Sequence, residues 1–171
     1  MNDASAPQTV PTAQPSTSPW RRRLKLTAVG LVGFMILSQA VPYGRSHSNP
    51  PVLREPTWDS PATAALVQTA CGDCHTNRSV WPWYSNIAPA SWLVQNDVDG
   101  GRKRLNFSEW NSPQPDVEDI IRQIRSGSMP PLQYKVIHRK AALSDTQRAQ
   151  LISGLEATFA ASPPIPGRRP N

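Results

Sequence analysis

The clearest regular pattern in this chain lies between residues 116 and 127. Four branched apolar residues stand there at positions i, i+3, i+4 and i+7, namely Val117, Ile120, Ile121 and Ile124. Residues at this spacing share one face of an α-helix. The first turn carries three acids, Asp116, Glu118 and Asp119, which complement the positive end of the helix dipole. We predict a helix with a buried isoleucine face that stops at Gly127.

Two further helices are predicted before this one. Near residue 60, Asp59 or Ser60 can cap a helix whose first turn suits Pro61, and this helix would end close to residue 70. Another is expected over residues 90–98, ended by the two glycines at 100 and 101. Its buried side would carry Trp92 and Leu93.

The last predicted helix begins at Ser144, since Gln147 three residues later completes a capping box. Its apolar face would consist of Leu151, Ile152, Leu155 and Phe159. No segment alternates convincingly as a strand. We therefore expect an all-α domain of four or five short helices over residues 58–161.

The N-terminal part of the chain has a different character. The run LKLTAVGLVGFMILSQAV over residues 24–41 follows three arginines at positions 21–23, and its only charged residue is Lys25. As a helix it would reach about 27 Å, against about 30 Å of bilayer hydrocarbon. We expect a transmembrane signal anchor over residues 21–41, with the basic residues on the cytoplasmic side. Cleavage after Ala40, which would release the remainder, is the alternative.

The prolines gather mainly outside the predicted helical domain. We expect a disordered cytoplasmic tail over residues 1–20 and a second disordered tail over 162–171. The proline-rich stretch 42–57 is expected to be an extended tether or a wrapping segment, and His47 within it a solvated loop residue. The helical domain would then lie on the periplasmic side of a bacterial inner membrane.

Charge does not favour a nucleic-acid partner. The chain has a formal net charge of +6, but four of its basic residues precede the apolar run. Residues 43–171 hold 14 basic and 11 acidic residues. Because no basic stripe with interleaved aromatic residues remains, we expect no nucleic acid to bind.

The candidate chemistry lies in the stretch CGDCH, which contains both cysteines of the chain, Cys71 and Cys74, followed by His75. A CxxC pair can be a redox dithiol, half of a zinc site, or, with the next residue histidine, a c-type haem attachment site. Zinc needs further ligands, and only His47 and His138 remain in the exported part. A redox dithiol needs a βαβ context that is missing.

The haem interpretation uses every part of the motif. The two thiols can form thioethers to one covalently bound haem c, and His75 can bind the iron from one side. Methionine is a frequent second axial ligand. Of three methionines, Met1 starts the chain and Met35 lies in the apolar run, so Met129 is the predicted second ligand. His138 is the alternative, although a structural role is expected first.

The match to known sequences is wider than CxxCH. After the motif come WPWYS, IAPASWL, GRKRLNFSEW and MPPLQY, with a histidine following, all in this order. This series resembles a bacterial family of membrane-anchored cytochrome c-like haem-binding domains over roughly residues 43–160. The resemblance implies a small helical domain around a covalent haem, held by Cys71, Cys74 and His75, with Met129 as the other ligand.

The chemistry of several neighbouring residues indicates roles beside the motif. The second ring nitrogen of His75 should donate to a backbone carbonyl, for which Pro82 and Pro89 are candidates. One of Trp81, Trp83 and Tyr84 could approach a haem propionate or cover the macrocycle. A basic cluster of Arg102, Lys103 and Arg104 could neutralise propionates or dock an acidic partner, although a solvated helix end is the simpler expectation.

Saturated axial ligation favours electron transfer over catalysis. We therefore expect a mono-haem electron carrier that is not an enzyme and that meets an unidentified redox partner protein. The alternative is a haem sensor or a small redox enzyme subunit with an open or histidine-ligated sixth position. A membrane-bound interaction module without haem is a third hypothesis.

Overall fold

The computed structural model describes residues 19–167. These residues belong to two compact units, which divide between Ala40 and Val41 and are described separately. Most of the tail predicted over residues 1–20, and the last four residues of the tail predicted over 162–171, lie outside the described residues.

The first unit contains helix α1, Pro19–Ser38. Four basic residues occupy its first turns, Arg21, Arg22, Arg23 and Lys25. The uncharged remainder, residues 26–38, reaches only about 20 Å, which is short of the roughly 30 Å of a bilayer core. Within the described part of the chain, no helix combines the length and apolar character needed to cross a membrane. The transmembrane helix predicted over residues 21–41 is therefore not supported.

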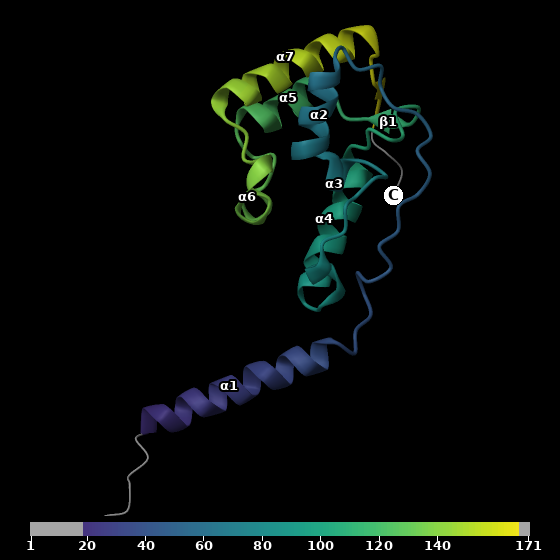
Figure 1. Cartoon of the computed structure of the whole chain (residues 1–171). Coiled ribbons are helices and arrows are strands. Elements are labelled where there is room, and N and C mark those ends of the chain that lie inside the picture. The colour runs from purple at the N-terminus through teal and green to yellow at the C-terminus, as the bar shows by residue number, and fades with distance from the viewer. Residues whose placement is uncertain (1–18, 168–171) are drawn as a thin grey trace, which may run out of the picture. The chain divides into compact units, whose positions relative to one another are not determined.

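The second unit is mostly helical, as predicted (Figure 1). Its α-helices are α2 (Pro61–Ala70), α3 (Gly72–His75), α4 (Ala90–Arg104), α5 (Val117–Arg125), α6 (Leu132–Ile137) and α7 (Asp145–Ala161). Two short 3-10 helices are η1 (Trp83–Asn86) and η2 (Arg139–Ala141). The described strands β1 (Pro113–Gln114) and β2 (Ile165–Pro166) form a two-residue parallel pair.

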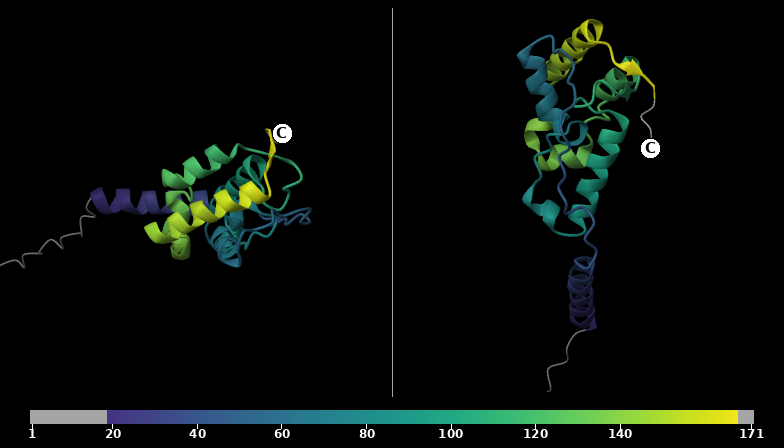
Figure 2. Two further views of the ribbon diagram at one scale, coloured as in Figure 1. Left: turned by 90° about the horizontal axis from the view of Figure 1, so that it is seen from above. Right: turned by 90° about the vertical axis from the view of Figure 1, so that its right-hand side faces the viewer.

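The apolar core of this unit lies where α7 packs across α2 and α5 (Figures 1 and 2). The predicted isoleucine face of α5 is buried, and so are Leu151, Leu155 and Phe159 of α7, whereas Ile152 is half-buried. The rings of Phe107, Trp110 and Phe159 stack in series, with centroids 5.8 Å and 5.4 Å apart. Apolar burial of this kind is the main favourable term in folding.

The predicted helix starts are confirmed. Ser60 caps α2 by accepting a hydrogen bond from the Thr63 backbone N–H, and Pro61 occupies its first turn. Ser144 and Gln147 form both halves of a capping box at the start of α7. Each of these signals is local in sequence, so tertiary packing does not override it.

Helix α4 differs from its prediction in length and in its buried side. It runs through both glycines to Arg104, and Leu93 is 52% exposed. The buried residues are small or polar: Ser91, Gln95, Val98 and Gly101. A Cβ atom at Gly101 would lie 2.3 Å from the backbone oxygen of Cys74. Gly101 therefore lets α4 approach the CxxCH turn closely, and it does not end the helix.

The proline-rich stretch before α2 belongs to the second unit and wraps around it. The backbones of Arg54 and Glu109 form an isolated parallel β-bridge. The Trp110 backbone N–H donates to the Arg54 carbonyl at 2.9 Å. His47 is half-buried rather than solvated. Its ring stacks on Trp81 with centroids 4.8 Å apart, and its Nε2 lies 2.9 Å from the Ser85 hydroxyl oxygen.

The chain after α7 is also tied to the domain, as far as it is described. The indole N–H of Trp110 donates to the Ser162 carbonyl at 3.0 Å, and residues 165–166 form β2. The described part of the predicted tail is thus ordered by contacts with residues 110–114.

Candidate functional site

The CxxCH motif forms one tight turn between α2 and α4. Helix α2 ends at Ala70, and Cys71 is both the C-cap of α2 and the N-cap of α3. The backbone N–H groups of Cys74 and His75 both donate to the Cys71 carbonyl, at 3.2 Å and 2.9 Å. Backbone hydrogen bonds within the motif therefore fix its conformation.

Both thiols are free and have environments that keep them protonated. Burial raises the pKa of Cys71 to about 12, helped by the neighbouring Cys74. Burial likewise raises the pKa of Cys74 to about 12, and the nearby carboxylates Asp97 and Asp73 add to this effect. Redox-active dithiols have the opposite property, a lowered thiol pKa. The site therefore does not fit a dithiol oxidoreductase.

A structural zinc site also lacks its ligands. Among residues 19–167, no three histidine, cysteine, aspartate or glutamate side chains are grouped so that they could hold a metal ion. His47 and His138 were the remaining candidate zinc ligands. They are hydrogen-bonded to Ser85 and Tyr84 respectively.

His75 is oriented by a backbone carbonyl. Its Nδ1–H donates to the Leu105 carbonyl at 2.9 Å, so the lone pair that can bind a metal is on Nε2. Burial lowers the pKa of His75 in spite of hydrogen bonds from the ring to Leu105 and Gly101, which favours the neutral, ligating form. The predicted acceptors Pro82 and Pro89 were wrong. The true acceptor follows α4, whose length the sequence did not indicate.

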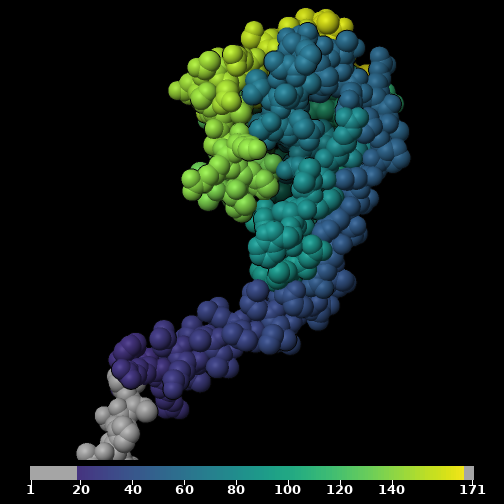
Figure 3. Space-filling model, viewed as in Figure 1, coloured from purple at the N-terminus to yellow at the C-terminus, as the bar shows by residue number. Residues whose placement is uncertain are grey.

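Two pockets flank the motif. Figure 3 shows the hollow on this side of the unit, between the yellow-green surface of α6 and the blue and teal surface of α2 to α4. The first pocket contains Cys71 and Met129, and its apolar wall includes Ile124, Leu143 and Leu151. The second contains Cys74. The two cysteines of the motif thus open into two different pockets that α6 faces.

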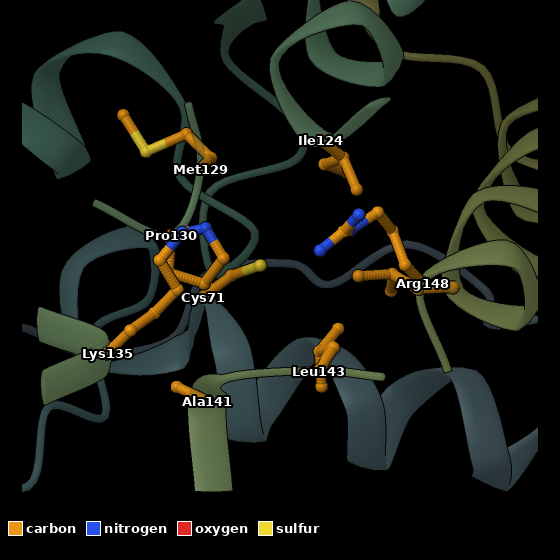
Figure 4. Close-up of a pocket in the computed structure, with 9 residues that line it drawn as sticks. Cys71, Ile124, Met129, Pro130, Lys135, Ala141, Leu143 and Arg148 are labelled. Carbon is orange, nitrogen blue, oxygen red and sulfur yellow. The ribbon is translucent and has the colours of Figure 1, made fainter. Parts of the chain in front are cut away.

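Met129 and Cys71 line the same pocket, although 58 positions separate them in sequence. The Met129 backbone N–H donates to the Gln123 carbonyl at 3.1 Å, and Lys135 Nζ donates to the Gly127 carbonyl at 3.3 Å. These bonds fix the loop between α5 and α6. In Figure 4 the Cys71 thiol and the Arg148 guanidinium point into the pocket, whereas the Met129 thioether extends away from it.

His138 lines the second pocket together with two tyrosines and two aspartates. Its Nε2 lies 2.9 Å from the Tyr84 hydroxyl, and its ring stacks on Tyr134 with centroids 4.3 Å apart. The Tyr134 hydroxyl donates to Asp73 Oδ2 at 2.6 Å. Burial, together with this bond, raises the pKa of Tyr134, so the hydroxyl keeps its proton. The engagement of Nε2 agrees with the structural role expected first for His138.

The three aromatic candidates have different environments. Trp83 is 77% exposed, whereas Trp81 and Tyr84 line the second pocket. The indole N–H of Trp81 is buried and has no hydrogen-bond partner. A buried donor without a partner is costly, and a bound group can supply the missing acceptor.

The basic cluster at the end of α4 is divided. Arg102 is half-buried and donates to the Thr76 and Ser48 carbonyl oxygens at 2.8 Å each. It also donates to Asn49 Oδ1 at 2.8 Å and to Ser79 Oγ at 2.9 Å. Arg102 thus joins the wrapping segment to the motif and is not a solvated helix end. Lys103 and Arg104 are exposed.

These residues fit a c-type haem. Two free thiols precede a histidine whose Nδ1 is engaged by the Leu105 carbonyl, which leaves Nε2 for a metal. A methionine and apolar side chains line the adjacent pocket, and the second pocket holds an indole donor that lacks an acceptor. Sequence reasoning found the motif and Met129 but missed Leu105 and the Tyr134–Asp73 pair. The spacing MPPLQYKVIH was the available signal for Tyr134.

Comparisons with known proteins agree with this chemistry. The family model described as a haem-binding domain matches residues 33–157. Cytochrome c peroxidase Ccp of Escherichia coli (strain K12) is 28% identical over 150 residues, which cover 75% of this chain and 31% of the peroxidase. The chain thus spans about a third of the length of that relative. No solved structure matches the chain.

The similarity to the peroxidase corrects one expectation from the sequence. The relative is an enzyme, so the finding contradicts the prediction that this chain is not an enzyme. Electron transfer and catalysis are not exclusive in haem proteins, since axial ligation and the distal pocket decide between them. With the family model covering most of the second unit, the chain belongs to the haem-binding domain family.

Proposed function

We propose that this chain carries one covalently attached haem c and acts as the electron-transferring haem unit of a peroxide-reducing enzyme. The observation that carries the proposal is the arrangement of His75. It directly follows two free thiols, and the Leu105 carbonyl fixes its ring so that Nε2 is left for a metal. The printed name of the similar protein, cytochrome c peroxidase, supports the reaction class.

Each predicted site residue has a role in this proposal. Cys71 and Cys74 would hold the haem through thioether bonds, and His75 and Met129 would supply the protein ligands of the iron. A c-type haem supplies a one-electron Fe(III)/Fe(II) couple, and a methionine ligand raises its potential. The first pocket, which Cys71 and Met129 share, offers an apolar wall that includes Ile124 and Leu151.

The electron balance defines what the chain must do. Reduction of hydrogen peroxide to two water molecules consumes two electrons and two protons, whereas one haem holds one electron at a time. The chain therefore receives an electron from a reduced donor protein and passes it on, twice for each peroxide. The proposal requires residues 42–171 to lie outside the cytoplasm, where covalent haem attachment takes place.

A second candidate function is favoured by the position of the Met129 side chain. Its thioether extends away from the pocket that it shares with Cys71 (Figure 4). If the methionine does not bind the iron, the sixth position is open and peroxide can react at this haem. The chain would then contain the peroxide site itself.

One experiment separates these two functions. The full chain is produced together with the c-haem maturation machinery, reduced, and mixed rapidly with hydrogen peroxide while the haem absorption is followed. We expect covalent pigment that survives denaturation, a low-spin spectrum and slow direct oxidation. Met129→Ala should lower the reduction potential and speed oxidation by peroxide.

The controls decide the interpretation. Replacing both cysteines, with Cys71→Ala and Cys74→Ala, should abolish the covalent pigment, and retention of the pigment would overturn the proposal. Rapid oxidation of the parent chain by peroxide, unchanged in Met129→Ala, would establish the second function instead. If His138 were the ligand instead, Met129→Ala would leave the spectrum unchanged.

A further inference from the structure

Helix α6 is attached to the domain in an unusual way. Within its six residues none is buried, and its apolar side chains Leu132, Val136 and Ile137 are 72%, 67% and 60% exposed. Apolar burial therefore does not hold this helix in place. Yet α6 begins directly after the loop that carries Met129. The position of α6 therefore contributes to the position of Met129, together with the bonds from Met129 to Gln123 and from Lys135 to Gly127.

The side chain that reaches from α6 to the motif is Tyr134. Its hydroxyl donates to Asp73 Oδ2 at 2.6 Å, and Asp73 stands between the two cysteines. The second carboxylate oxygen, Oδ1, accepts from the Val80 backbone N–H at 3.0 Å. The carboxylate is thus fixed on its own side and presents one oxygen to α6. A hydrogen bond to an ionised acceptor is stronger than one between neutral groups.

The Tyr134 ring is held from its other side by His138. The two rings are four residues apart, lie nearly parallel at an interplanar angle of 11°, and have centroids 4.3 Å apart. Tyr84, from η1, fixes the imidazole through the 2.9 Å hydrogen bond to Nε2. We call Asp73, Tyr84, Tyr134 and His138 the polar latch. All four line the pocket that contains Cys74.

We propose that Tyr134 is a positioning residue, whose hydrogen bond to Asp73 holds the Met129 loop at a fixed distance from the CxxCH turn and so keeps the methionine on the iron. The inference rests on the proposed function, because it presupposes that Met129 is the second ligand. It explains why a tyrosine stands five residues after the methionine and a histidine four residues after the tyrosine. Residues four apart on a helical turn are neighbours, as the ring stack requires.

The test compares three variants of the full haem-loaded chain. Tyr134→Phe removes the hydroxyl but keeps the ring that stacks on His138. Asp73→Asn keeps the shape of the acceptor and removes its charge. The matched control is Tyr43→Phe, since the Tyr43 hydroxyl also bonds to an aspartate, Asp99, at 3.5 Å, but neither residue lines either of the two pockets beside the motif.

Imidazole is the probe, because it competes with a protein ligand for the sixth position of ferric haem. We expect Tyr134→Phe to raise the apparent imidazole affinity about tenfold to a hundredfold, the range that loss of a hydrogen bond to a charged group predicts. The methionine-to-iron charge-transfer band should weaken in parallel. Asp73→Asn should produce a smaller increase, and Tyr43→Phe none.

The outcomes separate this inference from the proposed function. If Met129→Ala abolishes the charge-transfer band while both latch variants bind imidazole as the parent does, the positioning role is overturned and the haem function stands. If Met129→Ala leaves the band unchanged, Met129 is not the iron ligand, and both the positioning role of Tyr134 and the proposed methionine ligation fail. If Tyr134→Phe yields no folded pigment, the decision passes to Asp73→Asn, whose parent-like imidazole affinity would overturn the role.

Discussion

The α5–α7 side and the α6 side of the second unit are held together by different forces. Helices α5 and α7 bury Ile124, Leu155 and Phe159 in a continuous apolar core. Helix α6 buries none of its residues, and side-chain hydrogen bonds from Tyr134 and His138 join it to α3 and η1. The first side is held by apolar burial between its own helices. The second side encloses the space that we assign to the cofactor, and we expect its order to depend on what is bound there.

The largest expected effect concerns the apolar side. Phe159→Ala removes one ring from the Phe107–Trp110–Phe159 stack and should lower the free energy of unfolding by about 3–5 kcal/mol. Urea unfolding of a chain without haem, carrying Cys71→Ala and Cys74→Ala, measures it. The control on the other side is Leu132→Ala, which should stay within about 0.5 kcal/mol because Leu132 is 72% exposed. Equal losses in the two variants would remove the contrast.

The second effect tests close packing beneath the motif. In Gly101→Ala the new Cβ would collide with the Cys74 backbone oxygen, which should cost about 1–3 kcal/mol and reduce covalent haem incorporation. Gly100→Ala is the matched control, because a Cβ there meets no atom within 4 Å. An alanine in a helix interior should stabilise α4 by about 0.5–1 kcal/mol. Urea unfolding and pigment yield are compared between the two variants. If Gly101→Ala matched the parent in both, the predicted collision with the Cys74 backbone oxygen would be contradicted.

The smallest expected effect lies at the margin of the apolar side. Hydrogen bonding, first from Thr63 and also from Thr158, holds the pKa of Asp59 below its usual 3.8. Because the folded pKa is the lower one, this contribution to stability is present above pH 3.8 and is lost as pH falls through the folded value. Asp59→Asn should therefore flatten the decline in unfolding free energy below pH 3.8. Urea unfolding at several acidic pH values measures it, and parallel declines in parent and variant would contradict the assignment.

The features that the sequence predicted correctly are those with local causes. The isoleucine spacing of α5, the Ser60 cap and the Ser144–Gln147 capping box each act within one or two turns. The prediction of haem binding rested on the equally local CxxCH motif, and the haem-binding domain family confirms the binding of haem at this coarser level. Such signals remain valid whatever the rest of the chain does.

The features that the sequence did not predict depend on tertiary contact. Helix α4 continues through Gly101 because the motif packs against it, and its buried Gln95 breaks the rule that apolar residues mark the inner face. Helix α6 lacks an apolar periodicity because polar bonds hold it. The ring partner of His75 comes from Leu105, 30 residues away, where no side-chain pattern indicates a role.

That last contact has an evolutionary consequence. The group that orients His75 is the backbone carbonyl of residue 105, and every amino acid supplies one. Substitutions at this position can alter packing, since Leu105 is buried, but they cannot delete the acceptor. A point mutation at residue 105 therefore leaves Nε2 as the nitrogen that can bind a metal. Lineages can diverge around the site while the ring keeps its tautomer.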